Sequence, residues 1–219
     1  MFGEAWREET DDGKPWHVRE EFAIPLGWKL WRAADDGFAA PFACYWFTRS
    51  PDTGTIYVVD ELYRAGMTSD EVAERVKEKD ALIPRHDGRN EIQNPETVRG
   101  KLDSAAFANT GSGTEALGEQ MNRLGLKFDP VEKWPGSRIA RVQNFHRLLK
   151  PNPKTGRKEP GIVFFKRCRN AIATIPTLMR DPDDSEDIAD GQDDHAFDGV
   201  TYGVQEKPLS AKRIRLGGV

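Results

Sequence analysis

Three aspartates that follow or open predicted elements are the residues of this chain best suited to chemistry. Asp35 follows a predicted strand (about 28–34), Asp103 follows another (about 97–102), and Asp194 lies near the start of a predicted last helix. If the two strands are neighbours, Asp35 and Asp103 lie close together and Asp194 can face them. Clustered carboxylates repel one another, and a hard cation such as Mg²⁺, which prefers oxygen ligands, removes that penalty. Two such ions about 4 Å apart can activate a water and stabilise a leaving oxygen in phosphodiester cleavage.

Each aspartate also has a structural interpretation that stays open. Taken alone, Asp35-Asp36-Gly37 is more typical of a turn, and Asp103-Ser104 is more typical of a helix N-cap. Asp193-Asp194 is also a pair that the helix dipole favours in a first turn. His195 is expected to orient the acids rather than to bind metal itself.

Other metal and nucleotide motifs are missing from the sequence. The acidic stretch 181–198 lacks the D-x-[DN]-x-[DN]-G run and the following Glu of an EF-hand. The glycine-rich segment 109–113 lacks the G-x-x-x-x-G-K-[ST] of a P-loop, so the chain shows no ATPase signature. The four histidines do not pair with the two cysteines, which argues against a zinc site. Cys44 and Cys168 lie in apolar runs, which is typical of buried free thiols in a reducing compartment.

Basic residues are concentrated in one segment, although the whole chain has a net charge of −4. Residues 138–169 contain ten Lys or Arg and one acid, Glu159. The segment is either a solvated helix face with a polar loop or a track for a phosphate backbone, and both interpretations stay open. The candidate DNA contacts within it are Arg138, Arg141, Arg147, Lys150, Lys154, Arg157, Lys158 and Lys166.

The pattern of the elements predicts an α/β protein with a mixed sheet of about five strands flanked by helices. Strands at 28–34, 42–48 and 55–63 form a meander, and shorter strands follow at 97–102, 126–128 and 162–165. Helices are predicted at 69–79, 114–124, 138–149 (with Ser137 as N-cap) and 170–179, before the last helix near Asp193. Residues 80–96 and 108–113 are predicted loops.

The predicted organisation is an irregular N-terminal arm or linker (1–25), one domain (26–206) and a basic C-terminal tail (207–219). Trp6, Trp16 and Phe22 are expected to dock the arm on apolar residues. The sequence contains no run of about 18 apolar residues, so no membrane span is predicted. The acidic N-terminus is unlike a signal peptide, so the chain is not expected to be secreted.

Several short motifs, in order, resemble the C-terminal nuclease domain of large terminase subunits, the DNA-packaging motors of tailed bacteriophages. The resemblance runs from about His17 to Tyr202, and the last motif is similar to the family pattern D-H-A-Y-D-A-x-R-Y. The motifs are Phe22-x-Ile24-Pro25, Asp35-Asp36-Gly37-Phe38, Pro41-Phe42-Ala43, Glu61-Leu62-Tyr63, Asp103-Ser104-Ala105, Ser137-Arg138-Ile139 and Asp194-His195-Ala196-Phe197-Asp198-Gly199-x-x-Tyr202.

The resemblance implies an RNase H-like fold with a two-metal nuclease site. The family's three carboxylates fall on Asp35, Asp103 and Asp194, and Asp193 and Asp198 are neighbours that could share metal or water binding. Asp36 ranks below Asp35 because relatives often carry an aromatic residue there. The family's Asp-Pro-Ser is Asp103-Ser104-Ala105 here, which puts backbone stiffness after Asp103 in doubt.

The leading hypothesis is therefore an endonuclease with two Mg²⁺ or Mn²⁺ ions that cuts concatemeric double-stranded DNA with little sequence readout. Its expected partners are a terminase ATPase domain, a small terminase subunit and a portal, in the cytoplasm of the infected bacterial host. The alternatives are another RNase H-like nuclease, such as a junction resolvase, and a catalytically inactive DNA- or portal-docking module.

Overall fold

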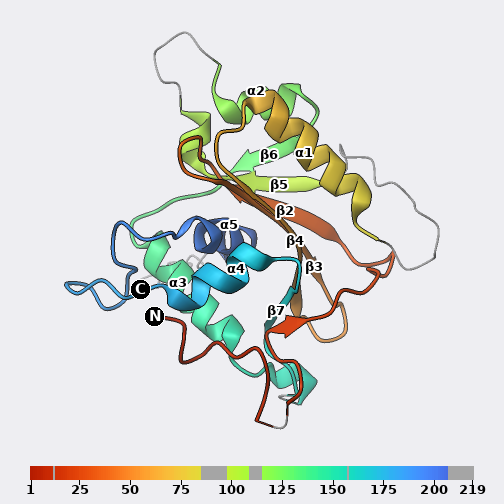
Figure 1. Ribbon diagram of the computed structural model, residues 1–219, viewed down its shortest axis with the longest axis vertical. Helices are drawn as coiled ribbons and strands as arrows, with labels where there is room; N and C mark the ends of the chain where they lie inside the picture. The colour runs from red at the N-terminus through yellow and green to blue at the C-terminus, as the bar shows by residue number, and fades with distance from the viewer. Residues whose placement is uncertain (12, 85–97, 109–114, 157, 207–219) are drawn as a thin grey trace, which may run out of the picture.

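Across the residues that the structure describes, the chain folds around one mixed seven-stranded sheet with helices on both faces (Figure 1). The computed structural model describes residues 1–11, 13–84, 98–108, 115–156 and 158–206. The strands lie in the order β1-β7-β4-β3-β2-β5-β6. Their bounds are β1 Val18–Arg19, β2 Leu30–Asp35, β3 Phe42–Arg49, β4 Ile56–Arg64, β5 Arg99–Leu102, β6 Lys127–Pro130 and β7 Ile162–Phe165. The predicted α/β class with a mixed sheet is confirmed, with seven strands where about five were expected.

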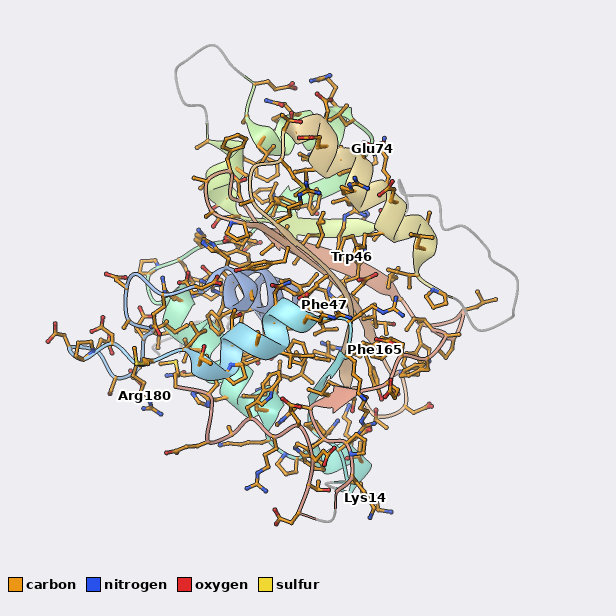
Figure 2. The ribbon with its side chains drawn as sticks, in the orientation of Figure 1. Lys14, Trp46, Phe47, Glu74, Phe165 and Arg180 are labelled. Atoms are coloured by element: carbon orange, nitrogen blue, oxygen red, sulfur yellow. The ribbon has the colours of Figure 1, made fainter. Side chains whose placement is uncertain are left out.

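Strands β2, β3 and β4 form the predicted antiparallel meander at the centre of the sheet. Every residue of β3 from Phe42 to Thr48 is buried, as expected for a strand covered on both faces. Trp46 and Phe47, labelled in Figure 2, belong to the apolar clusters on opposite faces. All other pairs of neighbouring strands are parallel, including β2 with β5 and β4 with β7.

The helices cover the two faces unequally (Figure 1). Val76 of α1 and Met121 of α2 pack on one face, and Phe145 of α3, Ala171 of α4 and Phe197 of α5 pack on the other. No helix in the described ranges is long and apolar enough to cross a membrane. The bounds are α1 Ser69–Leu82, α2 Leu117–Arg123, α3 Ser137–Leu149, α4 Arg169–Thr174 and α5 His195–Gly203, with 3-10 turns η2 Ser104–Phe107, η3 Pro153–Thr155 and η4 Ile175–Thr177.

Several predicted element ends are corrected by the structure. Helix α1 continues to Leu82, three residues past its predicted end, because Asp80 is held in the core. Ser137 is the first residue of α3 rather than its cap, which is Gly136. Helix α4 ends at Thr174 and continues as the 3-10 turn η4, which contains a proline. Most of the predicted loops 80–96 and 108–113, the start of the helix predicted at 114, Arg157 and the tail lie outside the described residues.

The segment predicted as an irregular arm takes part in the sheet and the core. Strand β1 pairs in parallel with β7, with Val18 opposite Phe164. Phe2 is fully buried between the rings of Phe145 and Phe197, at centroid distances of 5.1 and 5.3 Å. Trp6 is also buried, whereas Trp16 is half-buried and Phe22 is exposed. The segment therefore contributes a strand and core side chains; the boundary at residue 25 stays a prediction.

A buried ion pair joins α1 to the centre of the sheet. The Arg32 guanidinium, fully buried, donates from Nη1 to Asp80 Oδ2 at 2.5 Å, and Trp46 Nε1 donates to Asp80 Oδ1 at 2.6 Å. Arg32 also lies 4.8 Å from the centroid of the Phe128 ring. Gly100 makes room for this packing, because a Cβ there would lie 2.6 Å from Phe128 and 2.9 Å from Arg32.

We predict that Asp80→Leu costs about 3–5 kcal/mol of unfolding free energy, because it leaves the Arg32 charge buried without its partner. Urea unfolding measures the loss. Adding Arg32→Met should recover most of it, since the pair is then replaced by apolar groups of similar volume. Glu74→Leu, on the exposed side of the same helix, is the control (Figure 2). A double variant as unstable as Asp80→Leu would contradict the interpretation.

A buried histidine connects the N-terminal segment to α3. His17 Nε2 lies 2.9 Å from the carbonyl oxygen of Leu149, and the amide of Arg7 donates to His17 Nδ1 at 2.8 Å. Burial lowers the pKa of His17 below its usual value of 6.5. The unfolded chain therefore binds a proton there that the folded chain does not, and this contribution to stability is lost as the pH falls below about 6.5.

We expect wild-type protein to lose more stability than His17→Gln between about pH 7.5 and about pH 5.5. Urea unfolding at the two pH values, compared as a difference between the proteins, isolates the His17 contribution. Equal losses in both proteins would show that His17 does not control the acid sensitivity.

Candidate active site

Two of the predicted aspartates lie side by side because β2 and β5 are parallel neighbours. Ala34 is opposite Leu102, and the amide of Asp103 donates to the carbonyl oxygen of Ala34 at 3.1 Å. Asp35 is the last residue of β2, and Asp103 directly follows β5. The two acids therefore lie side by side at the C-terminal ends of these parallel strands. Their exposed fractions are only 7% and 9%. The condition under which the sequence places Asp35 beside Asp103, that their two strands are neighbours, is met.

Helix α5 packs over β2 and β5 and contacts both acids. His195 Nδ1 lies 2.9 Å from Asp35 Oδ2, and the Tyr202 hydroxyl donates to Asp103 Oδ2 at 2.8 Å. Asp198 lies three residues after His195 and four before Tyr202, so the three side chains share one face of the helix. The helix thus carries Asp198 between its contacts to Asp35 and Asp103.

Burial and repulsion from neighbouring acids raise the pKa of two of the clustered acids, Asp35 and Asp198. Burial, together with the nearby charges of Asp198 and Asp103, raises the pKa of Asp35 to about 7 against the opposing effect of His195. Burial also raises the pKa of Asp198, although Arg141 opposes the shift. Carboxylates whose charge is this costly are characteristic of functional sites.

Three cations contact the acids. Lys133 Nζ lies 2.8 and 2.9 Å from the two oxygens of Asp103. Arg141 Nη1, almost fully buried, donates to Asp198 Oδ1 at 2.6 Å and to the Thr201 hydroxyl at 2.9 Å. The third cation, Arg138, binds Asp194 at the border of the cluster. Burial raises the pKa of Asp103, but the hydrogen bonds from Lys133, the Ala105 amide and Tyr202 outweigh it and hold that pKa below its usual value.

The remaining predicted acids lie at the border of the cluster. Asp194 is the N-cap residue of α5, and its Oδ2 accepts from Arg138 Nη2 at 2.9 Å. Asp193 is exposed and accepts a hydrogen bond from the Tyr63 hydroxyl of β4. Burial and the charge of Asp103 raise the pKa of Asp36. Of the predicted metal ligands, Asp35, Asp103 and Asp198 interact through their charges, whereas Asp194 is bound to Arg138 and Asp193 to Tyr63.

The structural alternatives for the acids are partly true as well. Asp103 does cap η2, because its Oδ1 accepts from the amide of Ala105 at 2.8 Å. Asp194 occupies the N-cap position of α5 but makes no side-chain capping bond. The capping oxygen Oδ1 of Asp103 also accepts from Lys133, and Oδ2 accepts from Lys133 and Tyr202.

The cations of the predicted basic track have different partners in the structure. Arg138 and Arg141 face the acids, Arg147 pairs with Glu206 at 2.8 Å, and Lys166, beyond β7, pairs with Glu20. The loop after α3 exposes the three remaining lysines. These are Lys150, Lys154 and Lys158.

Sequence reasoning missed Lys133, the cation nearest to Asp103. It lies in the irregular segment between β6 and α3 and belongs to no motif. Only the parallel pairing of β6 with β5 brings its chain segment to Asp103. Glu61 is another buried acid, but it accepts from the amides of Asn170 and Ala171 at 2.8 and 3.2 Å and so holds the start of α4.

The donor chemistry of the site fits hard divalent cations. Asp35, Asp103 and Asp198 offer carboxylate oxygens, which Mg²⁺ and Mn²⁺ prefer. The described residues contain no preformed group of three or more His, Cys, Asp or Glu side chains that could hold a metal ion. In this arrangement the acids instead accept from Lys133, Arg138 and Arg141.

We predict that Arg141→Met destabilises the protein by about 2–3 kcal/mol, because the largely buried Asp198 loses its hydrogen-bonded cation. Adding Asp198→Asn should recover most of the loss, and urea unfolding of the four proteins of this cycle measures the coupling. Arg147→Met is the control, since its pair with Glu206 is exposed and should contribute at most about 1 kcal/mol. Additive losses in the cycle would contradict the coupling.

Comparison with known proteins gives a match in structure alone. No family model and no curated protein sequence matches the chain. The nuclease domain of the P22 large terminase superposes with a TM-score of 0.64 at 17% identity, covering 86% of each chain. The large terminase of a thermophilic bacteriophage gives 0.63 at 16% identity, covering 91% of this chain and 43% of that one. The large terminase nuclease domain of bacteriophage SPP1 with bound Mn gives 0.50 at 16% identity, covering 85% of this chain and 94% of that one. The chain therefore has the RNase H-like α/β fold of large terminase nuclease domains, as the sequence resemblance implied.

Proposed function

We propose that this chain is a metal-dependent DNA endonuclease domain of a phage genome-packaging terminase. The observation that carries the proposal is the convergence of Asp35, Asp103 and Asp198 where two parallel strands end under α5. The fold shared with the P22 nuclease domain supports it, and so does the Mn recorded with the SPP1 domain.

In this proposal Asp35, Asp103 and Asp198 hold two Mg²⁺ or Mn²⁺ ions. Such ions, when bound, make a water more acidic and stabilise a leaving oxygen. Asp198 takes the place that the sequence resemblance gave to Asp194, because its charge acts on Asp35 and it lies on α5 between His195 and Tyr202, which bind the other two acids. Both Asp198 and Asp194 also accept from an arginine. Asp193 and Asp194 are left as border residues.

The neighbouring side chains position these acids. His195 fixes the orientation of Asp35, and the Tyr202 hydroxyl fixes that of Asp103. Outer hydrogen-bond partners of this kind typically change metal affinity or activity by about 10- to 100-fold. Lys133, with 44% of its side chain exposed, adds a cation beside Asp103 that can attract a phosphate to the acids.

The proposed substrate is double-stranded DNA, cut with little sequence preference. Exposed cations after α3, including Lys150 and Lys154, are proposed to contact the phosphate backbone. The chain spans 43% of the large terminase of the thermophilic bacteriophage that it matches. On this basis the proposal includes three partners: a terminase ATPase domain, a small subunit and a portal. It also places the chain in the cytoplasm of an infected bacterium.

Cleavage of supercoiled plasmid in Mn²⁺, Mg²⁺ or EDTA tests the proposal. We expect metal-dependent nicking that falls by more than about 100-fold in Asp35→Asn, Asp103→Asn and Asp198→Asn, and by about 10- to 100-fold in His195→Gln. Asp194→Asn should stay within about tenfold of wild type. The exposed Asp183→Asn is the matched control, and circular dichroism confirms folding of each variant.

Nicking that survives both Asp35→Asn and Asp103→Asn would reject this site. A loss in Asp194→Asn equal to that in Asp35→Asn would restore Asp194 as the third ligand. Faster cleavage of branched junctions than of plain duplex would favour a resolvase over a packaging nuclease.

A further inference from the structure

A cavity of about 740 Å³ lies next to the acids, where α5 ends and leaves part of the sheet uncovered. Strands β2, β5 and β6 form its floor, and Tyr202, which binds Asp103, is in its wall. We call it the strand groove and define it by Lys29, Trp31, Arg49, Arg99, Lys101 and Trp134, which all line it.

Two strands in the floor of the strand groove, β2 and β5, run on to Asp35 and Asp103, although these acids do not line the cavity itself. Arg99, Lys101 and Asp103 are alternate residues along β5 and its end, so they lie on one face at steps of about 6.6 Å. Trp31 of β2 is opposite Arg99 in the ladder, and Ala33 is opposite Lys101. The next step of the same two strands carries Asp35 and Asp103. A chain lying along this face would pass from cations to carboxylates.

Four exposed cations line the strand groove, together with two exposed acids, Asp129 and Glu132. Lys29, Arg49, Arg99 and Lys101 are all exposed. Within the described part of the chain, Lys101 is 3.8 Å from Asp129, and the other three form no ion pair. Arg138 and Arg141 of the predicted track, in contrast, are bound to acids. The cations of the groove suit phosphate groups, each of which would release counterions on binding.

Aromatic side chains lie among these cations. Trp31 is half-buried, stacks on Phe47 at a centroid distance of 5.6 Å, and is fixed by a bond from its Nε1 to the carbonyl oxygen of Gly203 at 2.8 Å. Trp134 lies half-exposed on the opposite side, after β6. Grooves that combine cations with aromatic rings bind unpaired nucleic-acid strands, because each base offers a face for stacking. In a duplex the faces of the bases stack on one another and are not available for stacking on the protein.

We propose that the strand groove binds an unpaired segment of a DNA strand and leads it to the acids. This deepens the proposed function and rests on it. The phosphates lie along Arg49, Arg99 and Lys101, and a base stacks on Trp134. The nuclease thereby prefers DNA that is locally single-stranded at the point of cleavage.

Binding without cleavage tests the groove. Fluorescence anisotropy of the whole chain in EDTA compares a labelled oligo-dT with a duplex of equal length. We expect tighter binding of the single strand, and a Kd about tenfold weaker in Trp134→Leu but near wild type in Trp134→Phe, which keeps a ring for stacking. Arg49→Ala/Arg99→Ala should weaken binding and reduce the salt slope of log Kd by about 1.4, the value for two lost phosphate contacts on a single strand.

The matched control is Arg75→Ala/Lys77→Ala, which removes two exposed cations from α1 on the other face of the sheet. Equal effects of the groove and control pairs, or equal affinity for duplex and single strand, would overturn the inference. If wild type binds in this way but never cuts DNA, the nuclease proposal fails and the groove stands. If it cuts plasmid and the groove variants bind and cut normally, the groove fails and the nuclease stands.

Discussion

The parallel pairing of β2 with β5 is the constraint on which the site depends. It brings together two carboxylates that are 68 residues apart in sequence, Asp35 and Asp103, at the C-terminal ends of the two strands. Burying two acids together is costly, and the structure offsets that cost with hydrogen bonds and cations from other segments. Helix α5 packs over this part of the sheet through Ala196, Phe197 and Val200, and its His195 and Tyr202 each bind an acid. The position of Lys133 depends on a further pairing, that of β6 with β5.

Strand β2 is held from its other face as well. Arg32 points away from Asp35 and is bound to Asp80 of α1, while Trp46 of the neighbouring strand donates to the same carboxylate. The strand that presents Asp35 is therefore fixed between two apolar clusters, one under α1 and α2 and the other under α3, α4 and α5. A site built on such a strand depends on packing far from the acids.

The sequence predicts the parts of this arrangement that local patterns control. The meander and the ends of its strands follow from apolar runs and turn residues, whereas Asp35 and Asp103, candidates because they follow predicted strands, are favoured as site residues only by the family resemblance. The parts it does not predict depend on long-range contacts. Lys133 is an isolated lysine in a loop, and Asp198 can be ranked above Asp194 only when the face of α5 that meets the strands is known. The basic run at 138–169 reads as one track, but folding turns Arg138 and Arg141 towards the acids and Lys166 towards Glu20.

The pairing of β1 with β7 has a consequence for how the chain folds. Val18 is opposite Phe164, a separation of 146 residues, so closing this edge costs far more chain entropy than closing the meander. During synthesis the meander can form as soon as it is complete, whereas β1 has no strand partner until β7 has been made, and Phe2 lacks Phe197 until α5 has been made. Residues that are synthesised before the meander are therefore among the last to reach their final positions. Until then, their aromatic side chains are exposed to whatever else the new chain meets.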